Sequence, residues 1–471
     1  MTSNSITKTT TVNLGEIASS LLKQHPCTSK TGSSFDAKPT GHHLPSGFEL
    51  DDAATRAYDA LENNSPVVFL TGKAGTGKST FIEYVRQYLS RNSIVLAPTG
   101  VAALNVRGQT IHSFFKFPPR LFDDAEIQER RDTLIDRLQL IIIDEISMVR
   151  ADLLDHIDAA LRKWRRSKEP FGGIQVLLIG DCLQLPPVVA GRSEREFFNF
   201  HYRTPWFFGA KVLKQTPVAP AELTTSHRQE DPEFIEILDR IRTNSDHRTA
   251  VAEINRRCCR NQNMGEHHPD LTLTATNRHA ASINSIHLAE ISEPSRTFTG
   301  KKMGRFGLDD QRLPAPEKLE LKVGAQVMVT KNIAGAVNGS IGKVMRLSEN
   351  LITISLKSQD EEIAIQRETW EQFSYKWDSS SGAIRAEPTG SYEQFPLMLG
   401  WAVTIHKSQE LTLNSTFIDL GRGAFAPGQT YVALSRCKSI EGIRLARPIS
   451  MKDVLADSLV LDFHARLFGN I

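Results

Sequence analysis

The first half of the chain alternates short apolar runs with stretches of helical spacing. Near-continuous apolar runs occur at Val67 to Leu70, Ser93 to Ala97, Leu138 to Ile143 and Ile174 to Ile179. Runs of this length without polar alternation are typical of strands buried on both faces of a parallel sheet. Between the last two, residues 153–164 carry apolar side chains at helical spacing. This order predicts an α/β domain in which helices cover a parallel sheet.

The second half contains a stretch with a different periodicity. Leu271 to Thr274 is predicted to be a strand that leads into small polar residues. Residues 341–395 instead alternate short apolar runs, such as Leu351 to Leu356, with polar turns. Such alternation is typical of antiparallel strands. We therefore expect a small β domain inserted in the second half of the chain.

Composition narrows the class of protein. The 471 residues are 40% hydrophobic and 23% charged, which is ordinary for a soluble protein of about three domains. No apolar run reaches the roughly 18 residues that a membrane span requires, so we expect no membrane partner. Because the net charge is only +2, a nucleic acid would have to bind in a local groove. The five cysteines are scattered, which indicates a reducing compartment.

The first 43 residues differ from the rest in composition. They are rich in Ser and Thr and contain no arginine, whereas transit peptides are usually rich in arginine. We predict a flexible tail over 1–43 and a fold that begins near Leu44.

A phosphate-binding loop follows the first predicted strand. Gly72, Gly77, Lys78 and Ser79 match the pattern G-x-x-x-x-G-K-[ST]. Glycines let successive backbone N–H groups surround a phosphate, and the start of the helix beyond them favours negative charge. The lysine of such a loop reaches the β- and γ-phosphates, and its serine hydroxyl binds Mg²⁺. The residues that we expect to bind the nucleotide here are Gly72, Ala74, Gly75, Thr76, Gly77, Lys78, Ser79 and Thr80.

Two other predicted strands end in groups that suit nucleotide hydrolysis. Asp144 and Glu145 follow a buried strand; the first can hold Mg²⁺ together with Ser79, and the second can orient and deprotonate water. The alternative is that both acids cap the next helix. Gln184 follows another strand, where its amide could sense the γ-phosphate.

Two segments of the first half combine small, hydroxyl and aromatic residues. Pro98 to Ala103 is a predicted turn and helix start after a strand, which in a parallel sheet lies on the ligand-binding edge. Thr110 to Phe115 mixes hydroxyl, imidazole and aromatic groups, and these suit backbone and stacking contacts with a single strand. A buried Phe pair is the alternative for the second segment.

Taken together, the motifs resemble the PIF family (petite integration frequency) of DNA helicases, in superfamily one and the subgroup that includes RecD. From Phe48 to Leu445 the chain has, in the family's order, GKAGTGKS, APTGVAA, TIHSFF, DEISMV, PFGGIQ and GDCLQLPPV. The resemblance implies an α/β fold with two RecA-like P-loop NTPase domains, small accessory insertions and a small β-barrel. The implied ranges are 44–215 for the first domain with an insertion at about 116–137, 216–340 and 396–471 for the second domain, and 341–395 for the barrel.

The resemblance also implies which residues act. Arg228 and Arg436 lie in motifs that reach the ATP site from the second domain, and a guanidinium there can stabilise charge on the γ-phosphoryl. Gln429, within the last motif (Gly428 to Arg436), is implied to contact the nucleotide. The catalytic residues are therefore expected to be Lys78, Glu145, Gln184, Arg228 and Arg436. The expected DNA-binding residues are Pro98, Thr99, Gly100, Val101, His112, Phe114, Asn277, Asn338, Thr404, His406 and Lys407.

The family's activity gives the expected function. It is ATP- and Mg²⁺-dependent, 5′-to-3′ movement on single-stranded DNA, with unwinding of duplex, forked, RNA–DNA hybrid and G-quadruplex substrates. The alternatives are a DNA-stimulated ATPase that clamps or remodels DNA, and a RecD-like motor that acts only in a larger complex. We expect a monomer in the free state, located in the cytoplasm of a bacterium or phage-infected cell, or in the nucleus or mitochondrion of a eukaryote.

Two positions depart from the family pattern. The glutamine segment that usually recognises adenine is not apparent between Leu50 and Leu61, so the base preference stays open. Glu410 stands where the family has glycine after His-Lys-Ser-Gln, and a carboxylate there could repel the DNA backbone or alter a tight turn.

Overall fold

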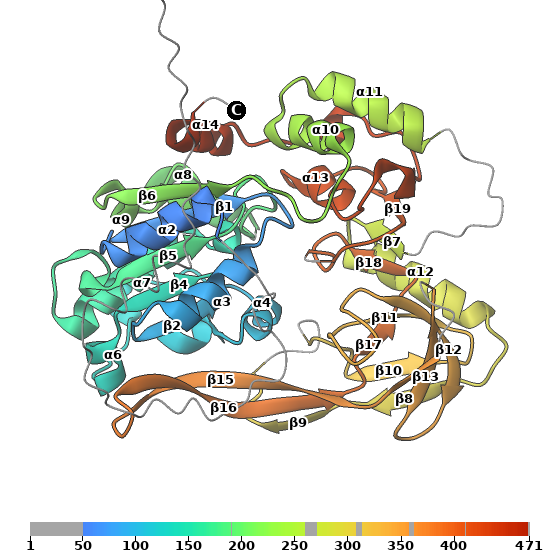
Figure 1. Ribbon diagram of the computed structural model, residues 1–471, viewed down its shortest axis with the longest axis horizontal. Coiled ribbons are helices and arrows are strands. Elements are labelled where there is room, and N and C mark those ends of the chain that lie inside the picture. Colours follow the sequence, from blue (N-terminus) through green and yellow to red (C-terminus); the bar gives the residue numbers. More distant parts are fainter. Residues whose placement is uncertain are drawn as a thin grey trace, which may run out of the picture. The chain divides into compact units, whose positions relative to one another are not determined.

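A six-stranded parallel sheet forms the core of the first domain (Figure 1). The computed structural model describes residues 50–189, 191–259, 271–307, 313–357, 362–409 and 411–469. The strand order is β3-β2-β4-β5-β1-β6, and every pair is parallel. The strands are β1 (Val67–Gly72), β2 (Ser93–Ala97), β3 (Gln109–Thr110), β4 (Leu140–Ile143), β5 (Gln175–Ile179) and β6 (Val218–Leu223).

Helices cover both faces of this sheet because its strands are apolar on both sides. Val67 and Phe69 of β1 pack into one hydrophobic cluster, whereas Val68 and Leu70 pack into another. The second cluster contains α2 (Asp52–Glu62) and α3 (Lys78–Tyr88). The first contains α5 (Ile111–Phe115), α6 (Thr133–Arg137), α7 (Ala151–Arg165), α8 (Gly191–His201) and α9 (Lys211–Lys214). The sequence prediction of a doubly covered parallel sheet is confirmed.

The predicted insertion at 116–137 is less separate from this domain than its charge suggests. It contains a short 3₁₀ turn at Asp124–Glu126 and helix α6. Ile127, Leu134 and Ile135 are nonetheless almost fully buried in the core of the first domain. The segment lies outside the sheet and still contributes to its packing.

A second, smaller parallel sheet has the order β18-β7-β19-β20. Its strands are β7 (Leu271–Thr274), β18 (Ala402–Thr404), β19 (Thr416–Asp419) and β20 (Ile443–Leu445). The associated helices are α10 (Pro232–Thr243), α11 (His247–Cys258), α12 (Asn277–Glu290) and α13 (Gln429–Leu434). The apolar faces of α10, α11 and α13 share one hydrophobic cluster with this sheet, whereas Leu288 of α12 belongs to a separate cluster. The chain therefore has two RecA-like α/β domains, each with its own core.

The β-insertion is larger than the predicted range of 341–395. A five-stranded antiparallel sheet has the order β14-β13-β12-β11-β17 and runs from residue 326 to residue 399. Beside it, β8 (Arg296–Thr299) pairs with β10 (Lys318–Leu321), and both strands share its core. The five strands are β11 (Gln326–Val329), β12 (Ile341–Leu347), β13 (Ile352–Leu356), β14 (Glu362–Ile365) and β17 (Leu397–Leu399).

A long hairpin extends from this insertion to the first domain (Figure 1). It consists of β15 (Glu368–Asp378) and β16 (Ala383–Gln394), and β9 (Lys301–Gly304) pairs with β16. Tyr375 lies in the core of the first domain, where its hydroxyl accepts a hydrogen bond from Val95 N at 2.9 Å and donates one to Val95 O at 3.1 Å. Residues 368–394 are thus an arm that links two domains rather than part of the barrel.

The last helix packs against the first domain, although residues 396–471 were predicted to belong to the second domain. Helix α14 (Ser458–Phe468) packs on the β1–β6 side of the first sheet. Phe463 contacts the rings of Phe69, Phe207 and Phe208 with centroid distances of 4.3–5.8 Å. The helix lies on the first domain because its aromatic rings are buried there, although the residues before it in the chain belong to the second domain. Within the described ranges, no helix is long and apolar enough to cross a membrane.

Candidate nucleotide site and DNA-facing edge

The phosphate-binding loop joins β1 to α3 with the geometry that the motif requires. Gly75 and Gly77 have φ values of +78° and +91°, a region that glycine enters at little cost. A Cβ atom at Gly77 would meet nothing within 4 Å, so the loop borders open space. Helix α3 begins at Lys78, directly after its N-cap Gly77. Its free N–H groups therefore face the loop.

Lys78 folds back over this loop. Its Nζ donates hydrogen bonds to the carbonyl oxygens of Gly72 and Lys73, both at 2.8 Å. Removal from water lowers the pKa of Lys78, and the carboxylates of Asp181, Glu145 and Asp144 oppose that shift. A phosphate is a stronger acceptor than a carbonyl oxygen. Lys78 is thus placed to exchange loop carbonyls for phosphate oxygens.

The two acids after β4 differ in environment. Asp144 is 6% exposed, and burial together with the adjacent Glu145 raises its pKa to about 7. Glu145 has φ +49° and ψ +45°, a left-handed conformation that is unfavourable for a residue with a side chain. Burial also raises the pKa of Glu145. Each property suits its expected role: a buried acid that can bind a cation, and a carboxylate whose raised pKa makes it a stronger base.

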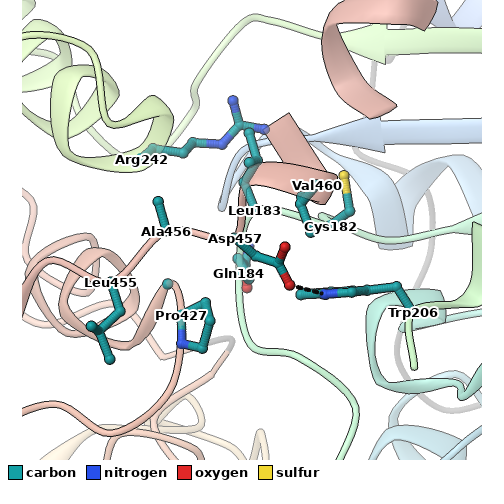
Figure 2. Close-up of a pocket in the computed structure, with 11 residues that line it drawn as sticks. Cys182, Leu183, Gln184, Trp206, Arg242, Pro427, Leu455, Ala456, Asp457 and Val460 are labelled. Carbon is teal, nitrogen blue, oxygen red and sulfur yellow. Dashed lines mark hydrogen bonds between the residues drawn. The ribbon is translucent and has the colours of Figure 1, made fainter. Parts of the chain in front are cut away.

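Gln184 lies in the loop after β5, where its amide is held by another side chain. Its Nε2 donates to Asp181 Oδ2 at 3.2 Å, and Asp181 Oδ1 accepts from Leu183 N at 3.1 Å. Both Gln184 and Asp181 are buried, at 8% and 1% exposed. Figure 2 shows Gln184 in the wall of a small cavity that is bordered on its other side by Pro427, Leu455 and Ala456.

Three of the described contacts between the second domain and the phosphate-binding side of the first domain are polar contacts to Gly75, Lys73 and Asp181. His227 N donates to Gly75 O at 2.9 Å. Lys73 of the loop forms an ion pair with Asp239 of α10. Asp181 forms an ion pair with Arg242 of α10 at 3.0 Å. The nucleotide site is therefore a cleft with walls from both domains.

Both predicted arginines lie in this cleft, and their guanidinium groups bond to their own domain. Arg228 donates to Thr412 Oγ1 at 3.0 Å and to Ser435 O at 3.3 Å. Arg436 is 1% exposed and donates to Val432 O and Ser435 Oγ at 2.8 and 2.9 Å. The positive charge of Arg436 is close enough to lower the pKa of Glu145 against the effect of burial.

Gln429 occupies the first turn of α13 and is fully buried. Its Oε1 accepts a hydrogen bond from Phe425 N at 3.0 Å. In the described part of the chain, its Nε2 has no hydrogen-bond partner. Since buried donors without partners are unfavourable, this amide is available to a ligand.

These observations test whether the residues fit ATP and Mg²⁺. The loop borders open space at Gly77, Lys78 bonds only to exchangeable carbonyls among the contacts given above, and Gln429 has a spare donor. Asp144 and the Ser79 hydroxyl supply the hard oxygen ligands that Mg²⁺ prefers. The set therefore fits the phosphates of ATP, and its oxygen atoms are of the kind that Mg²⁺ binds.

The predicted DNA-binding residues follow the carboxyl ends of four strands. Pro98, Thr99, Gly100 and Val101 come after β2, and His112 after β3, at the edge of the first sheet farthest from β1. Asn277 follows β7, and His406 and Lys407 follow β18, which is its neighbour in the second sheet. The parallel order therefore brings the two second-domain groups together. Asn338 comes from a different element, the turn before β12, where its N–H donates to Asn332 Oδ1 at 2.8 Å.

Phe114 and Thr404 are corrections to that set. Phe114 is 3% exposed and packs in the core beside Phe115 and Tyr375, so the alternative of a buried Phe pair holds. Thr404 is 4% exposed and its Oγ1 accepts from Lys407 N at 3.3 Å. Thr404 therefore shapes the turn that carries Lys407. Thr99 likewise accepts from Ala102 N at 3.2 Å as the cap of α4 (Gly100–Asn105).

Sequence reasoning missed several residues of the site. Asp239 and Arg242 lie in a helix with no recognisable motif, and their roles depend on tertiary contacts. Phe425 follows β19, is 61% exposed, and has its ring nearly parallel to that of His406 at a centroid distance of 6.5 Å. An exposed phenylalanine cannot be distinguished from a core one by spacing alone. Glu410 lies outside the described residues.

The fold and the site together define a P-loop NTPase with two RecA-like domains and a β-insertion. A sequence profile described as PIF1-like helicase matches residues 50–250, and one described as the 2B domain of DNA helicase Pif1 matches residues 309–347. ATP-dependent DNA helicase Pif1 of Bdellovibrio bacteriovorus is 31% identical over 435 residues, which are 90% of this chain and 93% of that protein. The chain belongs to the PIF1-like helicase family.

Other relatives are longer or have solved structures. ATP-dependent DNA helicase PIF1 of Mus musculus is 34% identical over 430 residues, or 85% of this chain. The chain spans about 60% of the length of the mouse and rat relatives. Pif1 from a Bacteroides species in complex with ADP-AlF4 has a TM-score of 0.81 and 35% identity, covering 89% of this chain and 97% of that one. A structure of Bacteroides Pif1 bound to single-stranded DNA has a TM-score of 0.64 and 36% identity, covering 89% of this chain and 97% of that one.

Proposed function

We propose that this chain is an ATP-driven DNA helicase that moves 5′ to 3′ along a single strand. The observation that carries the proposal is the set of three contacts between the phosphate-binding side of the first domain and the second domain, at Gly75, Lys73 and Asp181. A nucleotide bound between two such walls changes the spacing of the domains. The DNA-facing loops of both domains then change their separation with each hydrolysis cycle.

Each residue of the cleft has its own role in ATP hydrolysis. When bound, ATP with Mg²⁺ supplies a γ-phosphoryl group whose transfer to water provides the free energy. Lys78 and the amides of the loop bind phosphate oxygens, and Ser79 and Asp144 hold the cation. Glu145 accepts a proton from water. Arg228 and Arg436 release their hydrogen bonds to the oxygens of Ser435. They then donate to the phosphoryl oxygens on which negative charge develops.

At the predicted DNA-binding loops, contacts with the sugar-phosphate chain need no sequence information. Lys407 provides a cation and Asn277 an amide for the sugar-phosphate chain. Phe425 offers an exposed ring on which a base can stack. The relative from a Bacteroides species has been captured with single-stranded DNA, which supports this assignment.

A strand-displacement assay tests the proposal. Duplexes with a 5′ tail, a 3′ tail or no tail are mixed with the purified chain, Mg²⁺ and ATP, with Lys78→Ala as the inactive control. We expect release of the strand only from the duplex with a 5′ tail. Release only from 3′ tails would overturn the polarity. DNA-stimulated hydrolysis without release would identify a clamp or remodeller, whereas the absence of both would point to a subunit of a larger complex.

The same assay ranks substrates. A fork, an RNA–DNA hybrid and a G-quadruplex are each placed behind an identical 5′ tail, so that loading is constant and only the barrier changes. We expect all three to be resolved by the monomeric chain. A requirement for two molecules would appear as a second-order dependence of the initial rate on protein concentration.

A further inference from the structure

A buried ion pair joins the two domains next to the predicted γ-phosphate sensor. Arg242, near the end of α10, lies 3.0 Å from Asp181 after β5. The two side chains are 2% and 1% exposed. Burial alone would favour protonation of Asp181, but the charges of Arg242 and Lys78 outweigh burial and lower its pKa. Asp181 is therefore a carboxylate that depends on a group from the other domain.

The same carboxylate holds Gln184. Asp181 Oδ2 accepts from Gln184 Nε2 at 3.2 Å, while Asp181 Oδ1 accepts from Arg242 Nη2 and from Leu183 N. Within the described ranges, Arg242 Nε has no hydrogen-bond partner. Arg242 Nη2 lies 3.0 Å from Asp181 Oδ1 and 3.8 Å from Glu222 Oε1, so Asp181 is the nearer of two acids of the first domain. Any rotation of the Gln184 amide removes a donor from the carboxylate that anchors Arg242.

Helix α10 has a second contact on the same side. Asp239 lies three residues before Arg242, and side chains at this spacing share one face of a helix. Asp239 pairs with Lys73 of the phosphate-binding loop. Asp239 of this helix therefore pairs with Lys73 in the loop after β1, and Arg242 pairs with Asp181 in the loop after β5. Two complementary pairs fix its position between neighbouring strands of the first domain.

Packing leaves this junction little room to adapt. A Cβ atom on Gly428, before α13, would lie 2.3 Å from Gln184 O and 2.7 Å from Leu183 O. The adjoining cavity measures about 10 Å³ and is lined by Arg242, Gln184 and Gly428 among others (Figure 2). That volume is close to the minimum for one water molecule. A shift of the Gln184 segment must therefore move the second domain as well.

We propose that Arg242 is a positioning residue that transmits the state of Gln184 to the second domain through Asp181. The proposal rests on the function proposed above, because the signal is the presence of a γ-phosphate beside Gln184. With phosphate bound, the Gln184 amide turns from Asp181 to the ligand, the Asp181–Arg242 pair tightens or shifts, and α10 moves with it. Arg242 itself touches neither the nucleotide nor DNA.

The test compares Arg242→Met with Arg240→Met as a matched control. Arg240 is on the same helix but pairs with Glu236 and Asp246 of its own domain. The measured quantities are the dissociation constant of a fluorescent ATP analogue and ATP turnover with and without single-stranded DNA. For Arg242→Met we expect the dissociation constant to change less than threefold, and the ratio of DNA-stimulated to unstimulated turnover to fall at least tenfold. Arg240→Met should leave both unchanged.

Other variants keep the test decisive. Removing one partner of a buried ion pair leaves an uncompensated charge and can prevent folding. The double variant Asp181→Asn/Arg242→Met removes both charges and should lose stimulation to the same degree, whereas Arg242→Lys should recover part of it. An unchanged stimulation ratio in a folded variant would overturn the proposal, as would an equal loss of stimulated and unstimulated turnover. If the unaltered chain shows no stimulation by DNA, the proposed function fails instead.

Discussion

The nucleotide side of the molecule and its DNA-facing edge use polar residues in different ways. In the cleft, Asp181, Arg242 and Arg436 are at most 5% exposed and have protein partners. At the edge, Lys407 and Asn277 are exposed, and Phe425 extends its ring into solvent. Buried charges make strong, specific contacts and are costly to disturb. Exposed charges make weak contacts that add together, and such contacts can bind single-stranded DNA of any sequence.

The comparison predicts that single changes in the cleft have large effects and single changes at the edge small ones. The strongest case is Lys78→Ala, which removes the only loop lysine expected to contact the β- and γ-phosphates. We expect ATP turnover to fall by about 1,000-fold or more, given that one lost electrostatic contact at such a site costs about 100- to 1,000-fold and that binding weakens too. Turnover and nucleotide affinity are measured together, with exposed Lys452→Ala as the control. Near-normal turnover would contradict the loop's assignment.

A change in the second wall of the cleft should separate binding from turnover. Arg436→Gln keeps most of the side-chain volume but removes the charge. We expect turnover to fall by about 100- to 1,000-fold, a conservative figure for an arginine that stabilises phosphoryl transfer, while nucleotide affinity changes only a few-fold. Because the side chain is 1% exposed, a melting curve must first show that the variant is folded. A parallel loss of affinity and turnover would mean that Arg436 is structural.

The same contrast explains what could be predicted from the sequence. Lys78, Asp144, Glu145 and Gln184 follow buried strands, and because the carboxyl ends of parallel strands meet at one edge, both the fold and their proximity were predictable. Arg242 has no such signal, since its role depends on a helix of the other domain meeting β5. Pattern alone could not separate the buried Phe114 from the exposed Phe425 either.

The extent of the insertion also escaped prediction for a physical reason. Strand periodicity shows where strands are but not which sheet they join. Residues 368–394 have strand patterning like the barrel, yet Tyr375 is buried in the first domain and bonds to Val95. Similarly, the apolar helix at 458–468 packs against aromatic residues of the first domain and not against the second-domain residues that precede it in sequence.

The burial of Asp144 predicts a pH dependence of stability in the metal-free protein. Its pKa is about 7 in the folded state and about 3.9 in an unfolded chain. Between these values the folded state holds a proton that the unfolded state lacks, so the free energy of unfolding falls as pH rises, by up to about 1.4 kcal/mol per pH unit. The difference between the unaltered chain and Asp144→Asn, measured by urea titration in EDTA from pH 4 to 8, isolates this contribution. Parallel curves would show that Asp144 is not protonated on folding.

At the DNA-facing edge, Phe425→Ala should have the smallest effect and so tests the other half of the comparison. Loss of one stacking ring costs about 1 kcal/mol at the lower end of the usual range, or roughly a fivefold weaker affinity for single-stranded DNA. Phe200→Ala is the matched control, since Phe200 is 85% exposed on α8 and far in the chain from the predicted DNA-binding loops. Fluorescence anisotropy at two salt concentrations separates stacking from charge: the loss should be equal at both, because a ring releases no counterions. A loss of affinity that occurs only at low salt would mean that the substitution had displaced Lys407. A loss of affinity above about 100-fold would mean that the DNA-facing edge depends on single buried contacts, as the cleft does.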